Sequence, residues 1–198
     1  TGMNACLYDE DTYASGAGAG YVTHDHPEFR GKTLVLRPVC PLSEGEQRLA
    51  RFDITWQDGY LAEYCRTDQG VYAFDVVCKR PRAWWGNDAV ADSADPDAVR
   101  RFIELCYEPY AQRFSEEFGR AVPYIFTDEV QLDWLEYQWL IGKSEYRPEV
   151  IAAAYWTAQE AERFERMWGY SLLDRLPELF YRRKASRSRR SVSSISAL

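Results

Sequence analysis

Long apolar runs and paired cysteines are both missing from this sequence of 198 residues. No run approaches the ~18 consecutive apolar residues that a membrane helix needs, and the start of the sequence shows neither a basic segment nor an apolar signal stretch. We therefore expect no membrane partner. The cysteines form no C-x-x-C pair, which argues against a zinc site or a full set of disulfides. We expect all five to be small buried hydrophobes: Cys6, Cys40, Cys65, Cys78 and Cys106.

Histidine is also scarce, with only His24 and His26 in the chain. Together with Asp25 and Glu28 they could in principle bind a metal ion, but two close histidines are more typical of a polar loop. Loop carboxylates could also hold calcium, yet no spaced Asp/Asn/Gly loop supports this. The sequence therefore predicts no metal and no cofactor.

Apolar residues are abundant enough for a folded core, at 46% hydrophobic and 15% aromatic. The net charge of -7 is unevenly distributed, because residues 182–198 hold six Arg and Lys and no acid, and residues 1–181 hold 18 basic and 31 acidic side chains. Nucleic-acid binding depends on clustered basic residues, so an acidic body argues against a nucleic-acid partner. The Ser/Arg-rich tail at 182–198 cannot bury a core, and we expect it to be disordered.

Three antiparallel strands are predicted within residues 33–80. Apolar and polar residues alternate from Ala50 to Gln57, which is typical of a half-buried strand. Asp58-Gly59 is a two-residue hairpin turn, residues 60–66 return, and residues 71–79 form a third strand after another turn. We interpret this stretch as a β-meander inserted into a larger domain.

Helices and short apolar strands alternate in the remainder. Asp95-Pro96 predicts a helix start, and apolar residues at three- and four-residue steps continue the helix to Gly119, with a kink at Pro109. A second helix is expected over residues 148–168, with Gly169 as its stop and a short apolar segment at 172–181. Alternation of helices and strands is typical of a domain with a parallel sheet.

Acidic residues follow two short strands that we expect to be buried. Asp9, Glu10 and Asp11 come after residues 3–8, and Asp128 and Glu129 come after residues 121–126. In parallel α/β sheets ligands bind at the carboxyl ends of the strands, so these side chains should meet at one site. Glycoside hydrolysis uses a pair of carboxylates, and the residue types fit.

Aromatic residues close to these acids favour a sugar ligand, because pyranose rings lay their C–H faces on aromatic rings. The candidates are Tyr13, Trp84, Trp85 and Trp134. The alternative is that each tryptophan only packs its own loop, and that the acids are solvated loop carboxylates or helix caps.

Three stretches and one further landmark resemble the large bacterial glycoside hydrolases of the α-L-rhamnosidase-like kind. Residues 7–16 (Leu-Tyr-Asp-Glu-Asp-Thr-Tyr-Ala-Ser-Gly) are similar to that family's Y-D-E-x-x-W-P-S-G segment, and residues 125–129 (Ile-Phe-Thr-Asp-Glu) to its F-T-D-E-P strand end. Residues 95–110 resemble its intervening helix, and residues 169–180 a further landmark. Tyr13, Ala14 and Val130 stand where the pattern has Trp, Pro and Pro.

The resemblance implies an α/β fold, a partial (β/α)8 TIM-type barrel with the inserted β-meander. Residues 1–32 and 81–181 would form the partial barrel domain and residues 33–80 the insert. A complete barrel needs ~250 residues, and only about three strand–helix units can be counted, so we expect a fragment of a larger enzyme that need not be active alone.

The same resemblance implies hydrolysis of O-glycosidic bonds in an oligo- or polysaccharide. Glu129 would be the leading catalytic carboxylate with Asp128 beside it. Substrate-binding roles would fall to Asp9, Glu10, Tyr13, Trp84, Trp85 and Trp134, while Glu108 could assist or face water. Two alternatives stay open: a carbohydrate-binding protein without catalysis, and an interaction module whose basic tail docks on anionic surfaces.

Overall fold

The chain divides into two compact units in the computed structural model, which describes residues 2–9, 15–81, 89–128, 130 and 149–183. Unit 1 comprises Thr1–Thr33, Cys78–Glu136 and Tyr155–Ala158. Unit 2 comprises Leu34–Val77, Tyr137–Ala154 and Gln159–Leu198.

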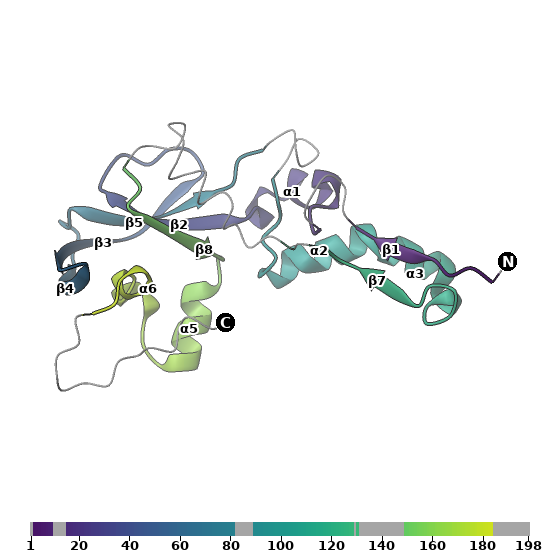
Figure 1. Cartoon of the computed structure of the whole chain (residues 1–198). Helices are drawn as coiled ribbons and strands as arrows, with labels where there is room; N and C mark the ends of the chain where they lie inside the picture. The colour runs from purple at the N-terminus through teal and green to yellow at the C-terminus, as the bar shows by residue number, and fades with distance from the viewer. Residues whose placement is uncertain (1, 10–14, 82–88, 129, 131–148, 184–198) are drawn as a thin grey trace. The chain divides into compact units, whose positions relative to one another are not determined.

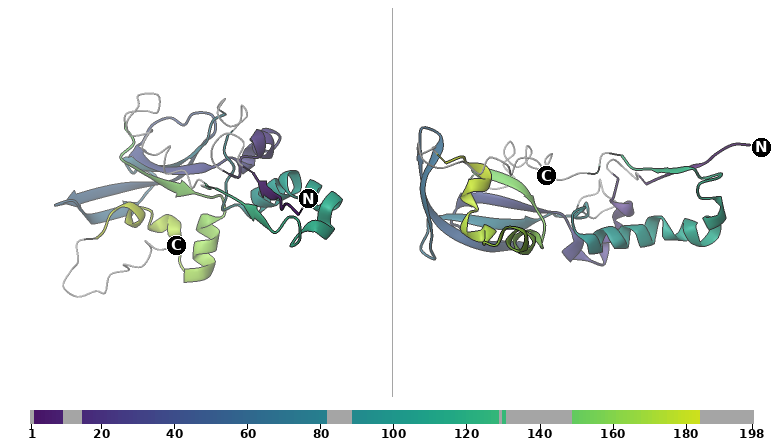
Figure 2. Two further views of the ribbon diagram at one scale, coloured as in Figure 1. Left: turned by 45° about the vertical axis from the view of Figure 1, so that its right-hand side comes forward. Right: turned by 90° about the horizontal axis from the view of Figure 1, so that it is seen from below.

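A curled five-stranded antiparallel sheet lies largely in unit 2 (Figures 1 and 2). Its strand order is β4-β3-β5-β2-β8. The strands are β2 (Lys32–Pro38), β3 (Glu46–Gln57), β4 (Tyr60–Arg66), β5 (Tyr72–Cys78) and β8 (Ala152–Trp156).

Local sequence explains the β3–β4 hairpin and the curl of the sheet. Asp58 and Gly59 both adopt left-handed backbone, with φ of 53° and 79°, the geometry of a tight hairpin turn that matches strand twist. Irregular register occurs twice in β3, between Thr55 and Trp56 against β4 and between Arg48 and Ala50 against β5. Because such bulges bend and twist a strand, they favour a curled sheet over a flat one.

Apolar residues of the strands form the core of unit 2 with the C-terminal helices. Phe52 and Phe74 are fully buried and their rings meet edge to face at 5.3 Å. Phe180 of α6 (Pro177–Phe180) stacks on Phe74 at 6.0 Å, and Leu176 beside it is fully buried. The amphipathic α5 (Glu160–Trp168) precedes η4 (Leu172–Asp174) and ends at Gly169, whose φ of 74° is the left-handed stop that the sequence predicted.

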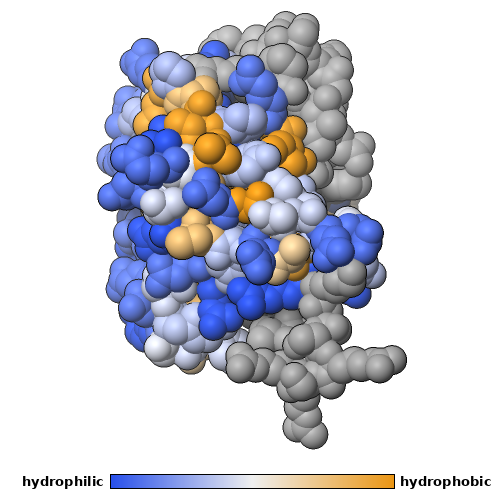
Figure 3. All heavy atoms as spheres, turned by 90° about the vertical axis from the view of Figure 1, so that its left-hand side faces the viewer, coloured by the Kyte–Doolittle hydropathy of each residue, from blue (hydrophilic) through white to orange (hydrophobic). Residues whose placement is uncertain are grey.

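The face shown in Figure 3 is mostly hydrophilic, with its apolar residues gathered in small patches.

A buried ionic network crosses the same sheet. The carboxylate of Asp75, fully buried on β5, accepts from Arg37 Nε at 2.8 Å and from Arg48 Nε at 2.9 Å. Arg37 also donates to both oxygens of Glu46, at 3.2 and 2.8 Å. Charges removed from water need such partners, and each member here has at least one.

Unit 1 contains helices and one short parallel sheet. Its elements are β1 (Cys6–Tyr8), η1 (Gly18–Gly20), α1 (Tyr21–His24), η2 (Pro27–Phe29), α2 (Pro96–Cys106), α3 (Glu108–Phe114), η3 (Ser115–Glu117) and β7 (Tyr124–Phe126). α1 packs against α2. At Gly18, which has φ of 53°, a Cβ atom would lie 3.1 Å from Val22 and 3.3 Å from Cys106 Sγ, so a side chain would crowd this contact.

The start of α2 agrees with its sequence signal. The side chain of Asp95 accepts from the Asp97 N–H at 2.9 Å, and Pro96 takes the first helical position. The helix breaks at Tyr107, and Pro109 lies in the first turn of α3, where its missing N–H costs little. The expected kink is confirmed as a break between two helices.

The expected TIM-type barrel is wrong. The main sheet is antiparallel. Among the described residues the parallel strands are β1 and β7, which pair over three residues each. Short turns such as Asp58-Gly59 produce antiparallel neighbours, whereas a barrel requires helical crossovers between parallel strands. The strands predicted at 50–57, 60–66 and 71–79 are present as β3, β4 and β5, but β3 lies between the other two, whereas a meander would place β4 in the middle.

The helix predicted over residues 148–168 is wrong in its first half. Residues Ala152–Trp156 form β8 at the edge of the sheet, where the Ile151 N–H donates to the Leu36 carbonyl at 2.8 Å. Helical structure begins only at Glu160. In the part of the chain that the structure describes, no helix has the length and apolar character needed to cross a bilayer.

Candidate functional site

The parallel sheet of unit 1 brings two predicted acidic strand ends to the same edge. β1 and β7 pair with Cys6 opposite Tyr124 and Tyr8 opposite Phe126, and the last two rings lie 5.2 Å apart. Both strands therefore end side by side, with Asp9 following one and Thr127 and Asp128 following the other. The strands are largely exposed, so the expectation that they are buried is wrong.

Ser15 connects the two strand ends. Its hydroxyl donates to Asp9 Oδ1 at 2.7 Å and accepts from the Asp128 N–H at 2.7 Å. The Ser15 N–H also donates to the Asp128 carbonyl at 3.0 Å. Ser15 is 1% exposed, so these bonds are shielded from competition with water and hold the Asp9 carboxylate in one orientation.

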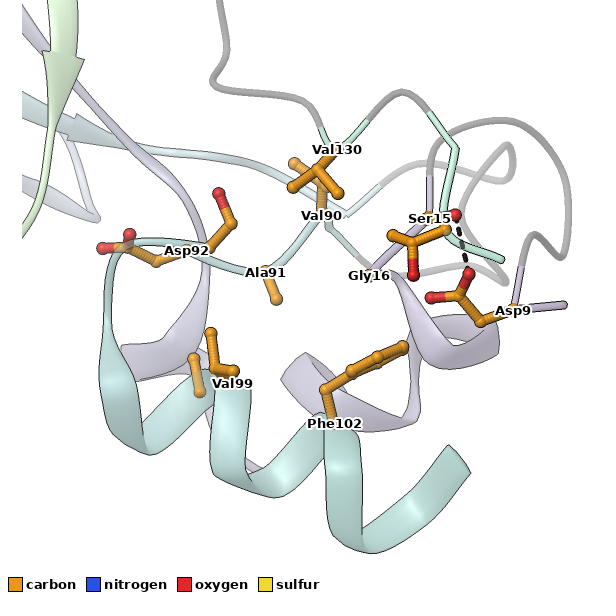
Figure 4. A pocket seen from close by; sticks show the side chains of 12 residues that line it. Asp9, Ser15, Gly16, Val90, Ala91, Asp92, Val99, Phe102 and Val130 are labelled. Atoms are coloured by element: carbon orange, nitrogen blue, oxygen red, sulfur yellow. Dashed lines mark hydrogen bonds between the residues drawn. The ribbon is translucent and has the colours of Figure 1, made fainter. Parts of the chain in front are cut away.

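Asp9 keeps one carboxylate oxygen without a partner. Oδ2 is buried and makes no hydrogen bond within the described residues. Figure 4 shows the Asp9 side chain pointing toward a cavity, with the bond to Ser15 on its other oxygen. A buried carboxylate oxygen without a donor is unfavourable, so this atom is ready to accept from a ligand.

The charge of Asp9 affects two groups on the neighbouring helix. Burial is the largest cause that raises the pKa of the Tyr107 hydroxyl, and the hydrogen bond with Thr127 opposes it. The negative charge of Asp9 and a hydrogen bond to its carboxylate add to the increase. Burial, followed by Asp9, also raises the pKa of the Cys106 thiol. Tyr107 OH lies 3.4 Å from Thr127 Oγ1, so the neutral phenol is available as a hydrogen-bond donor beside the site.

The cavity beside Asp9 has a volume of about 200 Å³. Apolar side chains form most of its wall, with Val90 and Val130 on one side and Val99 and Phe102 on the other (Figure 4). Its remaining lining residues include Ser15, Gly16, Ala91, Ser93, Ala98 and Thr127. Ligand pockets usually span ~300–1,000 Å³, so this one accommodates a single small group.

Asp92 lies at the opposite end of the cavity from Asp9 (Figure 4). It is fully buried, and its Oδ1 accepts from the Tyr155 hydroxyl and from the Ala94 N–H. Its Oδ2 lies 3.9 Å from Lys32 Nζ, which gives this carboxylate a cationic neighbour. Among the described residues Asp9 has no such cation within ion-pair distance.

Two of the candidate site residues are placed by the structure, and it brings them together. Asp9 and Asp128 lie at adjoining strand ends, joined through Ser15. Six others lie outside the described residues: Glu10, Tyr13, Trp84, Trp85, Glu129 and Trp134. Glu108 is exposed at the start of α3.

Sequence reasoning did not assign Ser15, Tyr107, Asp92 or Phe102 to a site. The signal for Ser15 was its place in the glycine-rich loop that follows the first acidic cluster. Nothing in the local sequence marked Asp92 or Phe102, because their role depends on which segments meet in space.

The histidine loop shows short pairs rather than a metal cage. His26 Nδ1 lies 3.0 Å from Glu28 Oε1, and His24 Nε2 lies 4.0 Å from an oxygen of Asp25. Within the described ranges, no group of three or more His, Cys, Asp or Glu side chains is placed to hold a metal ion. None of the five cysteines is buried: Cys6 and Cys65 are exposed and the others are half-buried, so the expectation that they are buried is wrong.

Comparison with known proteins identifies no relative of this chain. No family model matches the sequence, no curated protein is similar to it, and no solved structure resembles its fold. The geometry of the site is therefore the basis for assigning a function to this chain.

Proposed function

We propose that the chain is a carbohydrate-active protein that hydrolyses O-glycosidic bonds, related to the large bacterial glycoside hydrolases of the α-L-rhamnosidase-like kind. Its substrate would be an oligo- or polysaccharide. Glu129 and Asp128 would act in catalysis, and Asp9 and Glu10 would bind the sugar.

One observation carries this proposal: Asp9 and Asp128 leave adjacent parallel strands at the same end and are linked by Ser15. The first oxygen of Asp9 is fixed by that link and the second is unpaired at a cavity. Had the two strand ends pointed to different sides, the acidic residues could not have served one substrate.

The chemistry needs two carboxyl groups with different tasks. One protonates the leaving oxygen, and the other attacks the sugar or activates water. Asp128 lies two residues after the end of β7, and its backbone is bonded to Ser15, which also holds Asp9. Glu129, the next residue in the sequence, would supply the second carboxylate. The aromatic residues Tyr13, Trp84, Trp85 and Trp134 would stack on the sugar rings.

A second candidate function is carbohydrate binding without catalysis. In the described part of the cavity, Asp9 and Asp92 each have one buried carboxylate oxygen without a hydrogen bond, but only Asp92 has a cation near it, Lys32 at 3.9 Å. A single accepting carboxylate suits recognition of a sugar, whereas hydrolysis requires a second.

Hydrolysis of a panel of aryl glycosides by the full chain and its variants separates these two functions. Loss of a general acid or base lowers the rate by about 10²–10⁴-fold, so Glu129→Gln should abolish turnover while retaining sugar binding. Asp9→Asn should weaken binding. Asp25→Asn is the matched control, because it makes the same change of charge on an exposed side chain of unit 1.

Turnover by the unmodified chain that Glu129→Gln removes supports the hydrolase. Sugar binding with no turnover supports the binding protein. If no glycoside is cleaved and no sugar binds, both candidate functions are wrong.

A further inference from the structure

The cavity beside Asp9 combines apolar walls with two carboxylates, and among the described residues only one of them, Asp92, has a cation near it. Its charged lining residues are Asp9 and Asp92, and no basic side chain lines it among the described residues. The positive charge nearest Asp92 is Lys32, whose amine also donates to the carbonyls of Glu28 at 2.7 Å and Arg30 at 2.9 Å. These contacts hold the Lys32 amine at the Asp92 end of the cavity.

The Asp9 carboxylate has no charged hydrogen-bond donor among the described residues. Ser15 satisfies Oδ1 only, and Oδ2 is buried without a hydrogen bond. The Tyr107 hydroxyl interacts with the Asp9 carboxylate through charge and a hydrogen bond, but it is neutral, because burial and Asp9 raise its pKa. A neutral phenol can donate a hydrogen bond, but it does not cancel the charge.

Charge-assisted hydrogen bonds from ammonium to carboxylate are about twice as strong as those between neutral groups. Inside a largely apolar cavity the attraction between opposite charges is also stronger than in water. The aliphatic walls formed by Val90, Val99 and Val130 contact carbon atoms favourably but provide no hydrogen-bond donor. Among the described lining residues an anion would face two carboxylates and no basic side chain.

We propose that this cavity binds a protonated amine, and that the sugar recognised by the protein therefore carries an amino group. The ammonium would donate to Asp9 Oδ2 while the ring carbons contact the valines and Phe102. A cavity of about 200 Å³ accommodates the amino group and the part of the ring that carries it. This inference depends on the proposed carbohydrate function and specifies its substrate as an amino sugar.

The test compares three sugars of similar size and different charge. Glucosamine, glucose and glucuronate are titrated into the full chain at low ionic strength, and each Kd is measured by calorimetry or NMR. We expect glucosamine to bind at least about tenfold more tightly than glucose, which corresponds to about 1.4 kcal/mol, and glucuronate to bind most weakly. Asp9→Asn should remove the preference for glucosamine, and Asp25→Asn should retain it.

Equal affinity for glucose and glucosamine would overturn the inference and leave the carbohydrate function standing. The inference also fails if the preference survives in Asp9→Asn, because the ammonium would then bind elsewhere. If none of the three sugars binds, the carbohydrate function is wrong and the inference falls with it. Should Asp9→Asn not fold, the ratio of the two affinities in the unmodified chain decides alone.

Discussion

Asp75 is the residue whose replacement should most destabilise unit 2. Its carboxylate is fully buried and accepts hydrogen bonds from Arg37 and Arg48. Burial opposes the charge on Arg37, yet the hydrogen bonds that it donates to Glu46 and Asp75 outweigh burial and raise the pKa of the guanidinium. Arg37 therefore stays charged in the folded state, so Asp75→Asn leaves a buried cation that cannot become neutral.

The expected magnitude follows from what remains after the substitution. Removing one partner of a buried ion pair costs about 3–5 kcal/mol, because the other charge is left without compensation. Glu46 still contacts Arg37 through both of its oxygens, so we expect the lower end, about 3 kcal/mol. For a chain of this size, a loss of 1 kcal/mol lowers Tm by roughly 2–4 °C, which gives a decrease of about 6–12 °C.

Urea denaturation and thermal melting of Asp75→Asn measure this loss directly. The matched control is Asp174→Asn, which removes the same charge from an exposed pair in unit 2, where Arg66 lies 2.7 Å from Asp174. Exposed pairs contribute about 0–1 kcal/mol, so the control should unfold close to the unmodified chain. If Asp75→Asn and the control unfold within about 1 kcal/mol of each other, the buried network does not stabilise the sheet as argued.

Three further substitutions test the fold. Gly70→Ala should lower the free energy of unfolding by about 1–3 kcal/mol, since its Cβ would lie 2.5 Å from backbone atoms of Phe52, and chemical denaturation checks this. Asp95→Ala should cost about 1 kcal/mol through loss of the bond to the Asp97 N–H, with an unchanged melting curve arguing against the cap. Burial, and then the hydrogen bond to a carboxylate, raise the pKa of Tyr64 above its usual value of 10.0. The neutral hydroxyl therefore stabilises the fold fully below pH 10, and this contribution is lost as the pH rises through the pKa of the folded state. Tyr64→Phe should remove this part of the alkaline loss of stability, as measured by denaturation at a series of pH values.

Local signals predicted the parts of the fold that depend on a few neighbouring residues. Asp95 and Pro96 start a helix, and Asp58-Gly59 turns a hairpin, because each motif satisfies its own backbone geometry. The alternation of apolar and polar residues placed β3 well for the same reason. None of these signals depends on the rest of the chain.

Long-range pairing decided what the sequence did not reveal. Residues 152–154 are all alanine, a strong helix former, yet the segment becomes a strand because it pairs at the sheet edge next to Leu36. The prediction of a barrel was wrong for a similar reason, since the order of the strands in the main sheet depends on contacts between distant segments and not on any one of them. At the site, the strand ends beside Asp9 and Asp128 were predictable from the pattern, whereas the cavity wall formed by Val90 and Phe102 was not.

The bond between Ser15 and Asp128 also constrains when the site can form as the chain emerges from the ribosome. The two residues are 113 positions apart in the sequence, and every residue between them must be synthesised before they can meet. Closing so long a loop carries an entropic cost that local structure in the intervening segments reduces. Asp9 therefore precedes this stretch in synthesis but acquires its fixed orientation only after β7 has been added, which makes the link between the two strand ends a late feature of unit 1.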